Sequence, residues 1–148
     1  MNLYLFLLIS FLMAIVLRYD LNLTETTSLL GSSISDTDSK TGLQDAITPS
    51  WSTWVGITIY ILSIVVNVLG FYLFGWKWGI GLAFLFLIFL TIAKFIVPKS
   101  ESDHFNNMIF KSMINRYANY VKDNDSIRAN AMKELLERIG LEVPDGLE

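Results

Sequence analysis

Few residues of this chain have the type and spacing that metal binding or catalysis requires. Asp123, Asp125 and Glu134 fall at positions one, three and twelve of a calcium-binding loop. The fifth and sixth positions hold Ile127 and Arg128, where such a loop needs a ligand and a glycine for its sharp turn. We therefore interpret Asp125 as a helix cap and expect no bound metal.

The remaining chemistry-bearing residues are equally sparse. The chain has a single histidine, His104, beside Asp103, and it has no cysteine. One histidine cannot build a metal site or a catalytic triad, and no nucleophile is placed for it to activate. The absence of cysteine excludes disulfides, thiolate metal sites and cysteine nucleophiles. We therefore predict that the protein is not an enzyme and uses no cofactor.

The side chain with the clearest need for a specific partner is Asn67, which lies inside a long apolar run over residues 55–74. A carboxamide in hydrocarbon needs hydrogen-bonding partners, and a bond between two membrane helices contributes about 1 kcal/mol. We expect Asn67 to bond to Thr91 in the next apolar run, or to take part in self-association. A pore lining or an ion pathway is the alternative.

Small residues accompany this asparagine at helical spacing. They recur every seven residues in its own apolar run, and four residues apart at the start of the next run. Small residues allow two membrane helices to approach closely. We therefore predict a helix-packing stripe composed of Gly56, Ser63, Asn67, Gly70, Gly79 and Ala83.

Two apolar runs, residues 55–74 and 79–97, carry this stripe and are separated only by residues 75–78. Each run is close to the roughly 20 residues that a helix needs to cross about 30 Å of hydrocarbon. Neither contains an acidic residue, whereas proton relays and ion-coupled transporters place such groups inside the membrane. We therefore predict a transmembrane helical hairpin over residues 51–98.

Aromatic and basic side chains mark the ends of this hairpin. Tryptophan prefers the headgroup layer, and lysine extends its ammonium group towards that layer. The helical rise from Trp54 to Trp76 is about 33 Å, which matches one membrane crossing. The predicted interfacial anchors are Trp51, Trp54, Trp76, Trp78, Lys94 and Lys99.

A third apolar run, residues 3–17, is shorter, at about 22 Å of helix. We predict that residues 1–19 form an uncleaved N-terminal transmembrane helix, with Arg18 and Tyr19 reaching the headgroup layer. A cleaved signal peptide is the alternative, although the segment lacks the basic start and small-residue cut site of such peptides.

Residues 20–50 change abruptly to Ser, Thr, Asp and Gly, and we predict a polar flexible loop there. The clearest flexible stretch spans residues 31–40. Asn22, Leu23 and Thr24 match a glycosylation acceptor, but such triplets are common by chance.

Residues 99–148 are predicted to form a soluble helical tail, arranged as a helix pair. The first helix begins after Ser100 or Ser102, and the second runs over about residues 127–139 and ends at Gly140. So small a pair needs the membrane surface, a sister subunit or another partner as its support. The predicted contact face comprises Phe105, Ile109, Met113, Tyr117, Leu135 and Leu136.

Composition and charge agree with a membrane protein. The chain is 53% hydrophobic and 17% charged, which is too apolar for a soluble domain of this length. Its net charge of -3 argues against nucleic acid as a partner. A cytoplasmic C-terminus leaves only Lys77 outside, so the charge distribution predicts a multi-pass integral membrane protein with a cytoplasmic tail.

The sequence as a whole predicts an all-α integral membrane protein with three transmembrane helices, a short N-terminal one and a tight hairpin, plus the amphipathic tail. We expect a non-enzymatic accessory or scaffold subunit of a larger membrane complex, assembling through helix packing and the tail. Its partners would be membrane lipids and other membrane subunits or further copies of itself. The alternatives are a homo-oligomeric pore or membrane-disrupting effector and, third, a hairpin that shapes the bilayer.

Overall fold

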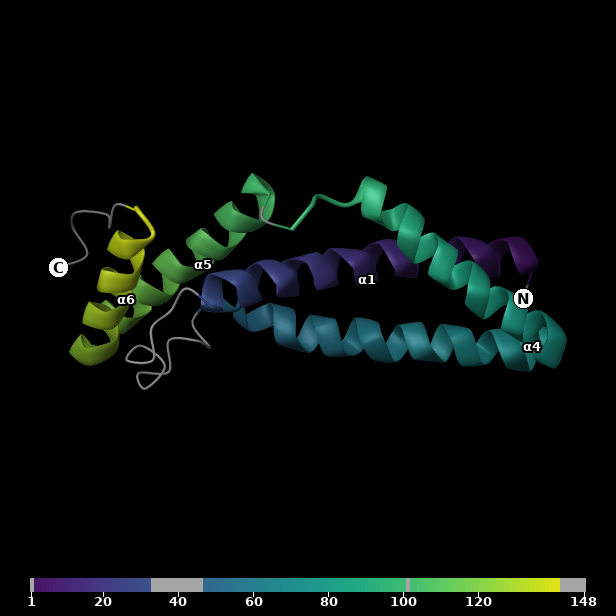
Figure 1. The fold of residues 1–148 in the computed structure, drawn as a ribbon. Coiled ribbons are helices and arrows are strands. Elements are labelled where there is room, and N and C mark those ends of the chain that lie inside the picture. Colours follow the sequence, from purple (N-terminus) through teal and green to yellow (C-terminus); the bar gives the residue numbers. More distant parts are fainter. Residues whose placement is uncertain (1, 33–46, 101, 142–148) are drawn as a thin grey trace. The chain divides into compact units, whose positions relative to one another are not determined.

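The computed structural model describes residues 2–32, 47–100 and 102–141 of the chain. Within these residues all regular secondary structure is helical, which confirms the all-α class (Figure 1). The chain divides into a first unit, Met1–Leu23 with Trp51–Ser100, and a second unit, Thr24–Ser50 with Glu101–Glu148. The helices are α1 (Leu3–Ser32), α4 (Ser50–Ile96), α5 (Asp103–Lys122) and α6 (Ser126–Arg138).

Helix α1 is longer than its apolar run. We predicted a helix over residues 1–19 followed by a polar loop, whereas the helix continues to Ser32. The continuation is stabilised by burial of polar and apolar side chains beyond the apolar run, including Asn22, Leu23 and Thr26. Residues 33–46 of the predicted loop lie outside the described residues.

Helix α4 consists of two arms, residues 50–74 and 76–96, that meet at Gly75. Gly75 has φ 79° and ψ 168°, a backbone conformation that is open essentially to glycine alone. The chain reverses direction at this point, and the second arm runs back from the turn (Figure 1). The predicted break between the two apolar runs is therefore present at Gly75.

Both α1 and α4 are long and apolar enough to span a membrane. Their candidate spans are Leu3–Leu30 and Trp51–Ile96, and in each the most apolar window has only 17% of its residues buried. A core helix of a soluble protein is mostly buried, whereas these helices direct large apolar side chains outward. Exposed examples are Leu8, Leu12, Tyr60, Ile61, Val68, Tyr72, Phe84, Leu87, Ile88 and Phe95.

Helix α1 contacts both arms of α4 within the first unit. The rings of Phe6 and Phe74 meet edge to face with their centroids 5.3 Å apart, and those of Phe11 and Phe89 with theirs 5.2 Å apart. The buried side of α1 repeats every four residues, as expected for one helical face. It comprises Phe6, Ser10, Ala14 and Asn22.

The second unit has an apolar core between α5 and α6, which pack against each other (Figure 1). Ile47 and Pro49, which precede α4, are buried too. Arg116 donates a hydrogen bond from Nη2 to the carbonyl oxygen of Thr48 at 2.6 Å. The core side chains are Phe105, Ile109, Met113, Tyr117, Ala129, Met132, Leu135 and Leu136.

This core includes every residue of the predicted tail contact face. We expected that face to rest on a membrane or a partner, but it is buried within the chain. The difference arises because α5 and α6 cover each other, and because Ile47 and Pro49, distant in sequence, are buried in the same unit.

Local signals set the ends of the tail helices. Ser102 occupies the N-cap position of α5, but its side chain makes no capping hydrogen bond. Asp125 caps α6, and Gly140, with φ 81°, follows its last turn. The predicted second tail helix and its glycine stop are confirmed.

We predict that Gly75→Ala destabilises the hairpin by about 1–3 kcal/mol, because a Cβ atom is strained at this φ and ψ. Unfolding of the purified protein in detergent, followed by tryptophan fluorescence, measures the change. Gly81→Ala is the matched control, because no atom lies within 4 Å of a Cβ at that position. Equal unfolding free energies for the two variants would contradict the prediction.

We also predict that Met113→Ala destabilises the helix pair by about 2–5 kcal/mol, because Met113 is completely buried and its truncation leaves a cavity. Hydrogen exchange of the α5 and α6 amides in the full chain should show faster opening. The exposed neighbour Lys111, changed to alanine, serves as the control and should leave exchange unchanged.

Candidate functional site

An open apolar groove of about 440 Å³ lies between the two arms of α4. Asn67 is the one polar side chain among its described lining residues. The groove is therefore suited to holding apolar groups, with one carboxamide in its lining. It is lined by Asn67, Phe71, Ile80, Ala83, Phe84, Phe86 and Leu87.

Asn67 does not form the hydrogen bond to Thr91 that we expected. Its Nδ2 donates to the carbonyl oxygen of Ser63 at 2.8 Å, one turn back along the same arm. The Thr91 hydroxyl donates to the carbonyl oxygen of Leu87 at 3.0 Å on the other arm. Both side chains thus use a carbonyl within their own helix, the local alternative open to short polar side chains. Within the described part of the chain, Oδ1 of Asn67 accepts no hydrogen bond.

The glycines of the predicted packing stripe lie at close approaches between helices or arms. A Cβ atom on Gly56 would lie 2.8 Å from Oδ2 of Asp20, which belongs to α1. A Cβ atom on Gly70 would lie 3.0 Å from Cζ of Phe6, also on α1. Across the turn, a Cβ atom on Gly79 would meet Cα of Phe71 at 2.8 Å.

The other stripe members differ in their exposure. Ser63 is buried, and its hydroxyl donates to the carbonyl oxygen of Tyr60 at 2.7 Å. Ala83 is half-buried and lines the groove, where its small side chain leaves space. Sequence reasoning missed Asp20 as a packing neighbour because it placed this residue in the loop. Its position one turn after the apolar run of α1 was the available signal.

All the predicted interfacial anchors are exposed. Trp76 and Trp78 lie at the turn between the arms, and the Trp76 ring is tilted against that of Phe71 with centroids 6.0 Å apart. Trp51 and Trp54 are at the start of the first arm, while Lys94 and Lys99 are at the end of the second. Aromatic side chains therefore mark both ends of the first arm.

The asparagine of the glycosylation triplet is buried. Asn22 is 2% exposed, and its Nδ2 donates to the carbonyl oxygen of Pro98 at 2.7 Å. A glycan cannot be attached to this amide without breaking that bond. Asn22 instead connects α1 to the segment that follows the second arm.

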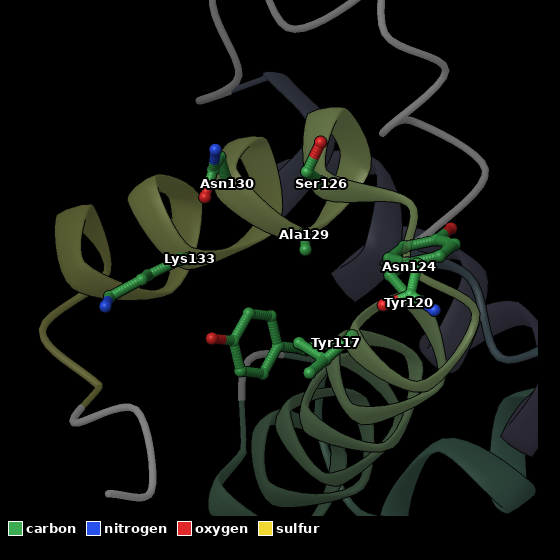
Figure 2. Close-up of a pocket in the computed structure, with 8 residues that line it drawn as sticks. Tyr117, Tyr120, Asn124, Ser126, Ala129, Asn130 and Lys133 are labelled. Atoms are coloured by element: carbon green, nitrogen blue, oxygen red, sulfur yellow. The ribbon is translucent and has the colours of Figure 1, made fainter. Parts of the chain in front are cut away.

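A second hollow, of about 250 Å³, lies in the second unit close to the connection between α5 and α6 (Figure 2). The ring of Tyr117 lies between the two helices and opposite Ala129. Nearby, the guanidinium carbon of Arg128 is 6.0 Å from the ring centroid of Tyr120. The described lining comprises Tyr117, Tyr120, Val121, Asn124, Ser126, Ala129, Asn130 and Lys133.

This hollow offers hydroxyl, amide and ammonium groups, but no carboxylate or histidine among its described lining residues. Such groups form hydrogen bonds with polar ligands or solvent. The hollow is therefore a polar surface feature of the helix pair.

The residues with calcium-loop spacing have other partners. Oδ1 of Asp125 accepts a hydrogen bond from the backbone N–H of Arg128 at 3.2 Å, which confirms Asp125 as the cap of α6. Glu134 pairs with Arg138 at 3.1 Å on the exposed side of α6. Among the described residues, no group of three His, Cys, Asp or Glu side chains is placed to hold a metal ion.

Comparisons of the chain with protein families, with curated proteins and with solved structures found no match.

We predict that Asp125→Ala lowers the stability of α6 by about 1 kcal/mol, because the first turn loses its capping acceptor. Hydrogen exchange of the first α6 amides measures the change. Asp123→Ala removes an equal charge two residues earlier, at the end of α5, and is the control. Equal exchange in the two variants would show that charge, and not capping, accounts for the effect.

Proposed function

We propose that the chain is a small non-enzymatic subunit or scaffold of a membrane protein complex, and that it assembles through the groove between the arms of α4. The observation that carries this proposal is Asn67. Asn67 lines an apolar groove, and its carboxamide oxygen accepts no hydrogen bond within the described part of the chain.

The depth of Asn67 makes this oxygen significant. Along the first arm, Asn67 is about 20 Å from Trp54 and about 11 Å from Phe74, the last residue before the turn that carries Trp76. If these tryptophans mark the two headgroup layers, Asn67 lies in hydrocarbon, where water cannot supply the missing donor. A polar side chain on a neighbouring membrane helix is the natural donor, and the groove provides the packing surface for that helix.

The proposed arrangement has three membrane crossings, formed by α1 and the two arms of α4. The apolar side chains on the outer surfaces of these helices face lipid, and the exposed tryptophans and lysines lie in the headgroup layers. The distribution of Lys and Arg favours a cytoplasmic tail. Because the apolar face of the tail is buried in the chain's own second unit, we assign assembly to the membrane helices.

A homo-oligomeric pore is the alternative, and one observation favours self-association. A carboxamide has both a donor and an acceptor, so Asn67 side chains from two copies could satisfy each other. The packing of the first unit gives less support to a pore lining. Ser63 and Gly70, the other polar and small residues proposed to line it, are buried within the chain.

The test compares wild-type protein with Asn67→Leu, which keeps a similar side-chain size but removes the carboxamide. Native mass spectrometry after gentle extraction from the host membranes reports mass and composition. Loss of one interhelical hydrogen bond, about 1 kcal/mol, should weaken the complex about fivefold. Thr91→Val is the control, because the Thr91 hydroxyl is satisfied within its own helix and does not line the groove.

A heteromeric mass that decreases in Asn67→Leu supports the subunit proposal. A closed homo-oligomer that leaks ions in reconstituted vesicles, with the leak reduced in Asn67→Leu, supports the pore. A monomeric mass for the wild type and both variants overturns the two proposals together.

A further inference from the structure

Arg18 is a cation on the inward side of α1 whose Nε has no acceptor in the described part of the chain. It lies four residues after Ala14 and four before Asn22, both buried in the first unit. The Nε atom of Arg18 is itself buried and makes no hydrogen bond. A charged group with a buried, unsatisfied donor is costly, so an anion that pairs with the guanidinium would lower this cost.

The neighbouring carboxylate does not fill this role. Asp20 is two residues further along α1, and its carboxylate lies against Gly56 on the first arm. Two residues correspond to about 200° of rotation on an α-helix, so Arg18 and Asp20 project from nearly opposite sides. The ion pairs among the residues that the structure describes join other side chains, and none of these pairs includes Arg18.

Contacts within the first unit show that Arg18 lies near the start of the first arm and the end of the second arm. The approach of Asp20 to Gly56 places this end of α1 beside the start of the first arm. The bond from Asn22 to Pro98 places it beside the end of the second arm. These two ends also carry the exposed anchors Trp51, Trp54, Lys94 and Lys99.

The charge at this level is positive. Within the first unit, Arg18, Lys94 and Lys99 contribute three cations at this end, against one carboxylate from Asp20, whereas Lys77 lies at the opposite end beside the turn. In a membrane, the acceptor that is abundant at the level of an interfacial tryptophan is the phosphate of a lipid headgroup. The planar guanidinium matches the geometry of phosphate oxygens.

We propose that Arg18 binds the phosphate of an anionic phospholipid at the end of the first unit where α1 and both arms meet. Lys94 and Lys99 add attraction for the negative charge. The bound phosphate pairs with the guanidinium group and connects α1 to α4 through the lipid. This inference rests on the membrane-spanning arrangement proposed above, but it does not depend on Asn67 or on a protein partner.

The test uses the full chain in mild detergent and native mass spectrometry with dioleoyl phosphatidylglycerol or dioleoyl phosphatidylcholine, which share their acyl chains. The wild type should retain phosphatidylglycerol preferentially. Arg18→Gln should weaken this retention about tenfold. Lys77→Gln removes the same charge at the opposite end of the unit and should bind like the wild type. Equal retention by Arg18→Gln and wild type, or equal loss in Lys77→Gln, would overturn the proposal.

Two further measurements identify the ligand. Millimolar inorganic phosphate should not displace the lipid, and displacement would assign the site to free phosphate instead. Loss of a polypeptide partner, without loss of lipid, in Arg18→Gln would assign Arg18 to a protein contact and would also overturn the proposal.

Two controls distinguish a loss of folding or of membrane insertion from a loss of lipid binding. Arg18→Lys keeps the positive charge but lacks the planar guanidinium group. This variant should fold even if Arg18→Gln does not, and it should bind the lipid more weakly than the wild type. Alkaline carbonate extraction of host membranes tests insertion. Release of the wild type would overturn both the membrane function and the lipid site, whereas retention with lipid binding independent of Arg18 would overturn the lipid site alone.

Discussion

Polar groups on helices in apolar surroundings must find hydrogen bonds without help from water. In the first unit, hydroxyl groups meet this constraint by donating to a carbonyl oxygen about one turn back along their own helix. The helices can therefore present long apolar surfaces without leaving these hydroxyls unsatisfied, and the outward-facing side chains remain compatible with lipid. The hydroxyls that bond in this way belong to Ser10, Thr58, Ser63 and Thr91.

Oδ1 of Asn67 and Nε of Arg18 depart from this pattern, and they do so at different depths. Oδ1 of Asn67 belongs to the groove lining and is far along the first arm from Trp51 and Trp54. Nε of Arg18 lies near the end of the unit where Asn22 meets Pro98. In the proposed membrane arrangement, the same constraint favours two kinds of partner, because a membrane helix offers donors at mid-depth and a phosphate offers acceptors in the headgroup layer.

The second unit is stabilised by different interactions. Its helices α5 and α6 bury a continuous apolar core, and α6 begins with a capping carboxylate, as in a water-soluble helix pair. Its buried face takes no part in the proposed assembly. Sequence reasoning identified Asn67 and the small residues around it as candidates for helix contacts. It could not identify the groove, because the lining combines side chains from two arms whose approach depends on the turn at Gly75.

Local sequence was sufficient for the features that depend on neighbouring residues. The length of the apolar runs, the short break between them and the periodicity of the tail predicted long apolar helices, a reversal within residues 75–78 and the second tail helix. Tertiary structure alone decided the extension of α1 to Ser32, the bond of Asn22 to Pro98 and the burial of the tail face. These features depend on contacts between segments distant in the chain, and such contacts leave no periodic signal in the sequence of either segment.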